Sequence, residues 1–227
     1  MAKLKFDELG KRIYETGVSE AVLFVQNASG QYPKGVAWNG ITAANESPSG
    51  AEANDQYADN IKYLSLTGAE NFEGTIEAFS SPVEFDECDG MKAIVKGAVA
   101  HQQNRTPFGF AFKSIVGNDV QGNDYGYKLH LWYGCKAAPS ERSHATVNDS
   151  PEPQNPSWSI SSTPVTVPGH KPTSVITIDS TQVEATKMQK VLDAVYGTDD
   201  ADAYLPLPEK VIELLSKLKL YRRYVIV

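Results

Sequence analysis

One stretch of alternating residues, interrupted by a repeated turn sequence, constrains the fold of this chain more than any other feature. Apolar side chains occupy every second position at residues 108–112 and again at residues 127–133. The tripeptide Gly-Asn-Asp occurs twice between these runs, at residues 117–119 and 122–124. A period of two is typical of a β-strand with one buried face, and Gly, Asn and Asp favour tight turns. The stretch therefore predicts a long antiparallel hairpin over residues 107–134, with one face in the core.

Similar patterns elsewhere predict a chain that is mainly β. The further strands are expected at residues 21–25, 61–66, 72–79, 157–162 and 173–178. Within the third of these, Ile76 and Ala78 fall on one face, while Glu73 and Glu77 fall on the other. Such a strand is half-buried, with its acidic side chains directed away from the core.

Two amphipathic segments near the end of the sequence predict α-helices. The first has Ser180 or Thr181 as its candidate N-cap, and Gly197 stands at the expected exit. The second begins with Pro208, which suits the first turn of a helix because that position needs no backbone donor.

Size and charge limit the classes of protein to which the chain can belong. Its 227 residues are enough to bury a core in one sizeable domain or two small ones. The formal net charge of −7 argues against tight nucleic-acid binding, which depends on cationic side chains that neutralise phosphates. The N-terminus is charged and no apolar run reaches membrane-spanning length, so we expect a cytoplasmic chain without membrane insertion. Cys88 and Cys135 are expected to be free thiols.

No arrangement of residues predicts a catalytic, cofactor or metal site. The histidines lack the spacing of a zinc site and are interpreted as surface residues; they are His101, His130, His144 and His170. The Gly-Asn-Asp repeat lacks the alternating acceptors and the closing glutamate of a calcium loop. Acidic residues around Cys88 are interpreted as a solvated strand edge. The nucleophile elbow, the phosphate-binding loop and the dinucleotide fingerprint are all absent, so an enzyme is not expected.

Residues 43–60 are expected to form an exposed loop. The segment contains four acidic residues, no basic residue and little that could be buried. Loops of this length without a packing pattern are usually functional or disordered.

The order of several short phrases along the chain is more specific than any phrase alone. In the central region they are Gly-Asn-Asp, then Tyr-Gly-Tyr-Lys-Leu-His-Leu at residues 125–131, Ala-Pro-Ser-Glu at 138–141 and Asn-Asp-Ser-Pro-Glu at 148–152. Earlier and later phrases occupy residues 13–18, 32–40, 46–52, 57–63, 76–79, 84–90, 103–109, 162–165, 196–197 and 205–208. In this order the chain resembles the major tail proteins, also called tail tube proteins, of long-tailed bacteriophages.

The resemblance covers roughly residues 11–212 and implies a fold. It implies one tail tube domain at residues 1–212 and leaves residues 213–227 as a C-terminal extension of unknown role. The implied tail-tube fold is a two-sheet β-sandwich or barrel with one or two flanking α-helices.

The family also implies a function, that of a structural virion protein. Its subunits form hexameric rings that stack around a tape-measure protein into a tail tube. Tail terminator and distal tail or baseplate proteins are the implied partners at the two ends. DNA passes through the lumen during ejection without specific binding. The implied location is the virion tail, after assembly in the host bacterial cytoplasm, and no cofactor or catalytic step is implied.

Two surfaces are candidates for assembly under this hypothesis. Glu73 and Glu77 are the candidate lumen-facing residues, since an acidic lumen would repel phosphates; an outer solvent face is an equal alternative. The exposed segment is the candidate ring-stacking loop, expected to become ordered only against the next ring. Its candidate residues are Glu46, Glu52, Asp55, Tyr57 and Asp59.

Two other interpretations stay open. The chain could be the tube subunit of a non-infective tail-like particle, which would need the same surfaces. It could instead be a soluble β-sandwich carbohydrate-binding module of a phage tail tip. In that case an exposed Trp38, Trp132 or Trp158 would stack on sugar rings.

Overall fold

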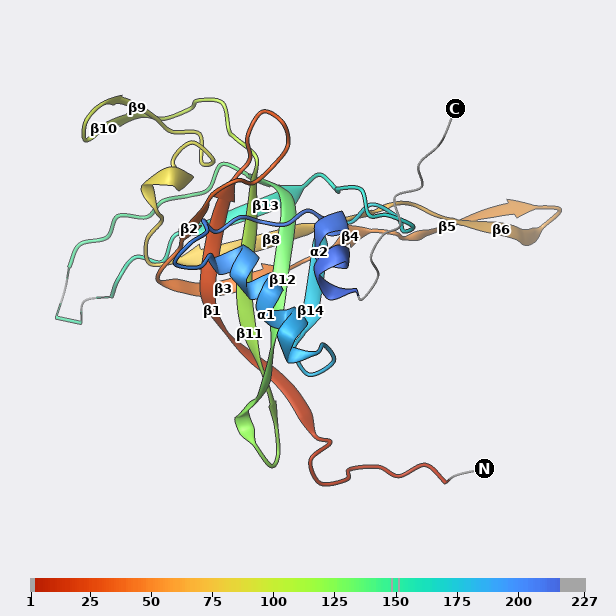
Figure 1. Ribbon diagram of the computed structural model, residues 1–227. Helices are drawn as coiled ribbons and strands as arrows, with labels where there is room; N and C mark the ends of the chain where they lie inside the picture. Colours follow the sequence, from red (N-terminus) through yellow and green to blue (C-terminus); the bar gives the residue numbers. More distant parts are fainter. Residues whose placement is uncertain (1–2, 148, 151, 217–227) are drawn as a thin grey trace, which may run out of the picture.

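The computed structural model describes residues 3–147, 149–150 and 152–216 (Figure 1). The strands are β1 (Ile13–Val25), β2 (Gly35–Ala37), β3 (Ile41–Glu46), β4 (Ser49–Gly50), β5 (Ala53–Ala58), β6 (Ile61–Thr67), β7 (Glu70–Asn71), β8 (Glu73–Ala78), β9 (Lys92–Val95), β10 (Ala98–Ala100), β11 (Phe108–Asn118), β12 (Gly122–Ala137), β13 (Ser157–Ser162) and β14 (Val175–Asp179). The helices are the 3-10 helix η1 (Val83–Phe85), α1 (Ala185–Tyr196) and α2 (Pro208–Leu215). The predicted fold class, mainly β with few helices, is confirmed. Residues 217–227 lie outside the described residues, so the division at residue 212 stays a prediction.

Eight of the strands form one antiparallel sheet. Its order is β2-β1-β11-β12-β13-β8-β3, and β14 also pairs with β12. Three two-stranded ribbons, β4–β7, β5–β6 and β9–β10, are separate from this sheet. The β5–β6 and β9–β10 ribbons project from the body on opposite sides (Figure 1).

The predicted central hairpin is confirmed as β11 and β12. Their register pairs Phe112 with His130 and Asn118 with Gly122, so the connecting loop is short. The side-chain carbonyl of Asn118 accepts hydrogen bonds from the backbone N–H groups of Val120 and Gln121. An asparagine that bonds to the backbone two and three residues later stabilises a turn, as the Gly-Asn-Asp phrase predicted.

The prediction that only one face of this hairpin is buried is wrong. Leu129, Leu131 and Tyr133 of β12 pack on the side of the helices, within one core cluster. Trp132 faces the other way and is also fully buried, in a second core cluster that contains Phe110. Both faces are covered because the sheet lies in the middle of the molecule.

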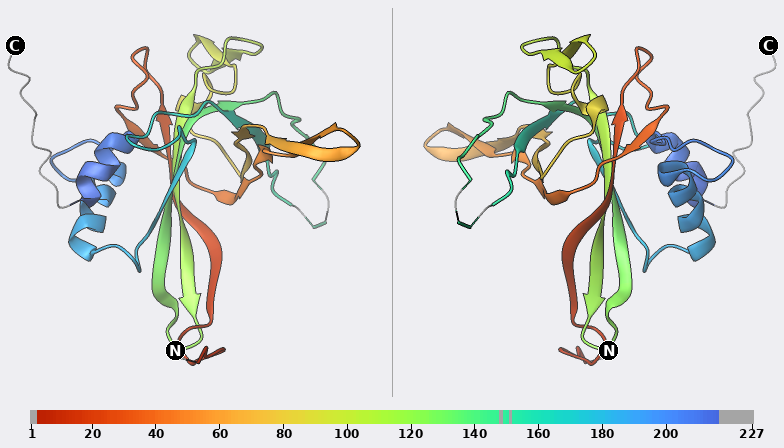
Figure 2. Two further views of the ribbon diagram at one scale, coloured as in Figure 1. Left: turned by 90° about the vertical axis from the view of Figure 1, so that its right-hand side faces the viewer. Right: turned by 90° about the vertical axis from the view of Figure 1, so that its left-hand side faces the viewer.

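The sheet curls so that one part of it covers another (Figure 2). Residues 128–132, in the middle of β12, pair with β14, on the side that leads to α1 and α2. The last residues of β12 pair with β13, which continues through β8 to β3. These three strands form a second layer over the face opposite the helices, and the aromatic core lies between the layers.

The change of partner along β12 occurs at Gly134. Its φ of 60° lies in the left-handed region, which favours glycine. Its N–H donates to the Tyr32 hydroxyl at 2.8 Å, and its carbonyl accepts the Thr163 N–H at 3.0 Å. A β-carbon at this position would lie 2.2 Å from the carbonyl oxygen of Thr163, so no larger residue fits without movement of the backbone.

Both predicted helices are present. Helix α1 ends at Tyr196, with Gly197 (φ 78°) as its C-cap, and α2 starts at Pro208, as expected. The predicted cap is wrong, because Glu184 takes the N-cap position of α1, whereas Ser180 and Thr181 lie in the turn before it. Among the described residues, neither helix combines the length and apolarity needed to cross a membrane.

The segment at residues 43–60 is not the expected loop, because most of it is strand. It contains the end of β3, all of β4 and all of β5. The β5 strand pairs with β6 from Ala53↔Thr67 to Ala58↔Ile61. A ribbon of this kind satisfies its backbone hydrogen bonds without burying its side chains, so the sequence carries no burial pattern to reveal it.

Replacing Gly134 by alanine is expected to destabilise the fold strongly. A left-handed φ costs a residue with a side chain about 1 kcal/mol, and the collision with Thr163 should raise the loss to about 3 kcal/mol. Gly122 has the same φ of 60° but no heavy atom within 4 Å of the β-carbon position, so G122A is a matched control. Urea unfolding measures both variants, and equal losses would contradict a steric role for Gly134.

Candidate functional site

Strand β8 presents Glu73 and Glu77 on its outward side. The residues between them alternate as predicted, with Gly74, Ile76 and Ala78 buried. This outward side belongs to the second layer and faces away from the helices (Figure 2). The two candidate lumen residues therefore share one surface, and its position in an assembly stays a prediction.

The neighbours of these carboxylates are mainly hydroxyl groups. The register pairs β8 residues 73, 75 and 77 with Ser161, Ser159 and Ser157 of β13. We call this surface, formed by Glu73, Thr75, Glu77, Ser157, Ser159 and Ser161, the β8 face. Lys136 of β12 pairs with Ser161 and places one basic residue at the end of the row. The β8 face is thus hydrophilic, and carboxylates outnumber the neighbouring ammonium group.

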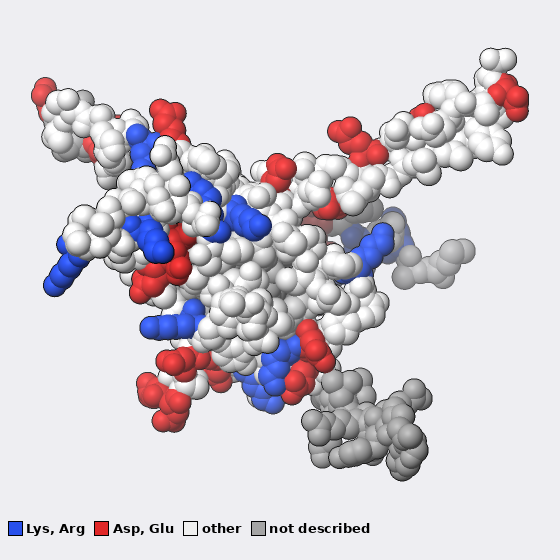
Figure 3. Space-filling view, turned by 90° about the horizontal axis from the view of Figure 1, so that it is seen from above, with Lys and Arg blue, Asp and Glu red and all other residues white. Residues whose placement is uncertain are grey.

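Four of the five candidate stacking residues belong to the β5–β6 ribbon, defined as residues 52–67. Glu52 precedes β5, Asp55 and Tyr57 lie within it, and Asp59 occupies the turn. Acidic side chains are visible along this ribbon out to its tip (Figure 3). Lys62 lies 2.7 Å from Asp55, and this contact, with a hydrogen bond from Ser65, lowers the Asp55 pKa.

Large apolar side chains of the β5–β6 ribbon are exposed to solvent. Tyr57 is 71% exposed, Tyr63 is 68% exposed, and Ile61 and Leu66 are each more than half exposed. The ribbon pairs only with itself, so neither of its faces packs against the main sheet. Contiguous exposed apolar residues of this kind mark an interaction surface.

Glu46, the fifth candidate, is partly exposed, and its carboxylate is turned toward Trp132 and His130. A register shift between Ile41 and Ala43 changes which side chains of β3 face inward, so that Ala44 packs against the core. Glu46 then lies opposite Gly74, whose missing β-carbon leaves room for the Trp132 ring. Its carboxylate accepts a hydrogen bond from the Trp132 indole at 3.0 Å.

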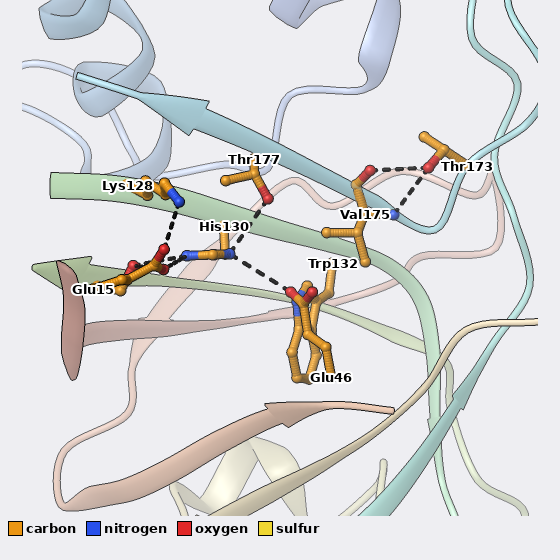
Figure 4. Close-up of polar contacts among 9 residues, drawn as sticks. Glu15, Glu46, Lys128, His130, Trp132, Thr173, Val175 and Thr177 are labelled. Carbon is orange, nitrogen blue, oxygen red and sulfur yellow. Dashed lines mark hydrogen bonds and ion pairs between the residues drawn. The ribbon is translucent and has the colours of Figure 1, made fainter. Parts of the chain in front are cut away.

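Glu46 belongs to a polar cluster around His130 that the sequence analysis missed (Figure 4). His130 is 9% exposed and stacks on Phe112 with the rings 4° from parallel, so its interpretation as a surface histidine is wrong. Its Nδ1 lies 3.6 Å from Glu46 Oε1, and its Nε2 lies 3.4 Å from Glu15 Oε1. Lys128 also pairs with Glu15. The histidine thus lies between two carboxylates from different layers.

The cluster contains a serine, a histidine and a glutamate, as some hydrolase triads do, but their geometry does not allow triad chemistry. Ser114 Oγ lies 2.9 Å from His130 Nε2, and Glu46 stands beyond the opposite ring nitrogen. In a triad the histidine takes the proton of the serine. Here the Ser114 hydroxyl donates to Glu15 at 2.6 Å and the residue is 5% exposed, so no substrate carbonyl can approach it. The geometry indicates a structural network that joins β1, β3, β11 and β12.

The charge pattern of the cluster favours ionised carboxylates. The hydrogen bond with His130 is the main cause of a lowered pKa for Glu46; partial burial opposes it, and the Trp132 N–H reinforces it. For Glu15, burial works to raise the pKa, but hydrogen bonds from Lys128 and Ser114 outweigh it and lower the value. Both carboxylates are therefore more acidic in the folded than in the unfolded chain.

The remaining candidate groups do not form a site. Trp38, Trp132 and Trp158 are each at most 2% exposed, so they cannot stack on a sugar. Cys88 and Cys135 are free and buried, as predicted, and burial raises the pKa of Cys88 to about 12. Within the part of the chain that the structure describes, no group of three or more acidic, histidine or cysteine side chains could hold a metal ion.

Comparisons with known proteins find eleven matching chains among solved structures, two of which are described here. No family model and no curated protein matches the chain. A chain of the anti-feeding prophage baseplate is 7% identical, with a TM-score of 0.37, over 77% of this chain and 97% of that one. A chain of the sheath–tube complex of PVC, an extracellular contractile injection system, is 13% identical, with a TM-score of 0.31, over 70% and 88%. At these values neither match assigns a function to this chain.

Replacing Glu46 by glutamine is expected to lower the free energy of unfolding at neutral pH by about 1 kcal/mol, since a partly exposed charged partner of His130 is lost. A carboxyl group whose pKa is lowered by folding stabilises the fold above its unfolded pKa. That contribution disappears as the pH falls through the folded pKa. The difference between wild type and E46Q should therefore shrink below about pH 4, which urea unfolding at several pH values would measure.

The control for this experiment is Glu84→Gln. Glu84 is exposed, and the described part of the chain shows no hydrogen bond or ion pair for its side chain. Its replacement should leave stability unchanged at every pH. If the loss of unfolding free energy in E46Q stayed constant down to acidic pH, it would indicate a packing defect and not the loss of a charge.

Proposed function

We propose that this chain is a structural virion protein, the subunit of a phage tail tube whose hexameric rings stack around a lumen. The observation that carries the proposal is the β5–β6 ribbon, which extends from the body with its large apolar side chains exposed. The ordered phrases of the sequence, and their resemblance to tail tube proteins, support the same function.

The ribbon requires a partner for physical reasons. An isolated two-stranded hairpin is at best marginally stable in water, and this one gains no burial from its own chain. A second copy of the chain is the partner that fits a self-assembling protein. If each copy offers its ribbon to a different surface of the next, the contact is heterologous and repeats into a ring or a filament. We therefore assign ring stacking to the ribbon and no longer to Glu46.

The β8 face is the proposed lining of the lumen. It lies on the side of the molecule away from the helices, and its exposed groups are carboxylates and serine hydroxyls. A hydrophilic surface with an excess of negative charge repels phosphates, so DNA would pass along it without binding. Lys136 at one end moderates this charge but does not reverse it.

The same proposal includes the other components of a tail. The tube would enclose a tape-measure protein and meet a tail terminator at one end and distal tail or baseplate proteins at the other. It would assemble in the bacterial cytoplasm and reside in the virion tail. Residues 1–212 would supply the tube domain, with residues 213–227 as an extension, and no catalytic step. The tube of a non-infective tail-like particle would use the same surfaces.

Negative-stain electron microscopy of the purified protein should show six-fold rings or hollow tubes. A variant with residues 53–67 replaced by a short Gly-Ser linker should remain folded, because the ribbon lies outside the main sheet, but should not form tubes. Circular dichroism checks its folding and sedimentation velocity its assembly. Normal tubes from this variant would reject the role of the ribbon. A wild-type chain that never associates would reject the proposal.

A cysteine at position 77 tests the lumen assignment. Both native cysteines are buried, so Glu77→Cys should supply the reactive thiol. In tubes, a small maleimide should still react, while a bulky polyethylene-glycol maleimide should react much more slowly than with the free subunit. Gln189→Cys on the exposed side of α1 is the control, expected to react with both. Equal reaction of E77C with the bulky reagent in tubes would place the β8 face outside.

A further inference from the structure

A second ribbon of the chain is also exposed and apolar. We call residues 92–100, which form β9, β10 and their turn, the β9–β10 ribbon. Ile94 and Val95 are 68% and 64% exposed, and Val99 is also exposed. Like the first ribbon, it forms a separate two-stranded sheet without a neighbour in the body. It thus presents a second apolar surface that nothing in the described chain covers.

The two ribbons carry opposite charge. The β9–β10 ribbon contains Lys92 and Lys96 and no acidic residue, a balance of +2. The β5–β6 ribbon contains three acidic residues and one basic residue, a balance of −2. Among the described residues, neither lysine of the β9–β10 ribbon forms an ion pair, and only Asp55 of the three acids does. Surfaces with complementary charge attract each other during encounter and exclude like-charged alternatives.

The base of the β9–β10 ribbon is fixed to the body. Asp89, which is 8% exposed, accepts hydrogen bonds from Arg105 at 2.9 Å, from Arg142, and from the Trp158 indole at 3.2 Å. The Gln103 N–H closes the base of the loop on the Gly90 carbonyl at 2.9 Å. A ribbon held at its base in this way loses less conformational freedom on binding than a free loop.

We propose that the β9–β10 ribbon of one copy is the surface that receives the β5–β6 ribbon of the next copy. The inference rests on the proposed function and names the partner surface of its stacking element. The ribbons project on opposite sides of the body, so one contact leaves the other ribbon of each copy free to repeat it (Figure 1). The exposed apolar side chains of both ribbons would become buried in the contact. The opposite charges of the two ribbons would select this pairing over contacts between two like ribbons.

Two charge-reversed variants test the pairing. E52K/Q56K/D59N changes the balance of the β5–β6 ribbon from −2 to +2; asparagine is used at position 59 because its φ is 50°. K92E/K96E changes the β9–β10 ribbon from +2 to −2. K34E/K190E makes the same change in net charge at two exposed lysines elsewhere and is the matched control. Thermal unfolding by circular dichroism checks that all three fold.

Sedimentation velocity then measures association, and electron microscopy identifies its product. Each ribbon variant alone should lose association, whereas an equimolar mixture should regain it, because each β5–β6 ribbon again meets a β9–β10 ribbon of opposite charge. The control should associate like wild type, and wild-type association should weaken as salt increases.

The possible outcomes test the contact between the two ribbons and the formation of a tube independently. Association of the mixture into irregular fibres would uphold the ribbon contact and reject the tube. Tubes from either ribbon variant alone, or no recovery in the mixture, would overturn the contact while leaving the tube intact. A wild-type chain that stays monomeric at every ionic strength would overturn both.

Discussion

Strand β12 has one partner along one edge and two along the other, and this division organises the molecule. On one side it pairs with β11 over nearly its whole length. On the other it pairs first with β14 and then, beyond Gly134, with β13. The left-handed conformation of Gly134 turns the strand, and the Tyr32 hydroxyl and the Thr163 backbone hold its polar groups. The middle of β12 thereby leads to the helices, and the last residues lead to the second layer.

With this division, the body buries an apolar core, whereas the apolar side chains of the two ribbons stay exposed. Both faces of the central hairpin are covered, one by helix α1 and one by the aromatic cluster between the layers. The two projecting ribbons cannot reach either core, so their apolar side chains remain exposed. A chain that completes its core and still exposes large apolar side chains on extended strands has the features of an assembling subunit. Charges of opposite sign on the two ribbons then restrict which surfaces can meet.

The His130 cluster shows how the two layers are joined by polar contacts at the border of the apolar core, where Glu15 and Glu46 remain partly exposed. Glu15 from β1 and Glu46 from β3 approach the ring from opposite sides, while Phe112 stacks on it. A buried polar network needs every member to be satisfied, because an unpaired group costs more than an apolar substitute. The cluster thus fixes how β3 lies over the central sheet. It also explains why a residue set that resembles a catalytic triad has a structural role here.

The sequence by itself determined much of the local structure, although not the strands within residues 43–60. Period-two alternation and the Gly-Asn-Asp turns located β11, β12, β8 and β13, and the positions of Gly197 and Pro208 bounded the helices. Tertiary structure alone decided that both faces of the central hairpin are buried. Alternation cannot show that Trp132 and Leu131 are both buried, because this depends on layers contributed by distant segments. Nor could it place Glu46 beside Trp132 and His130, because one extra residue in β3 moves every later side chain to the opposite face, and the partner strand fixes that shift.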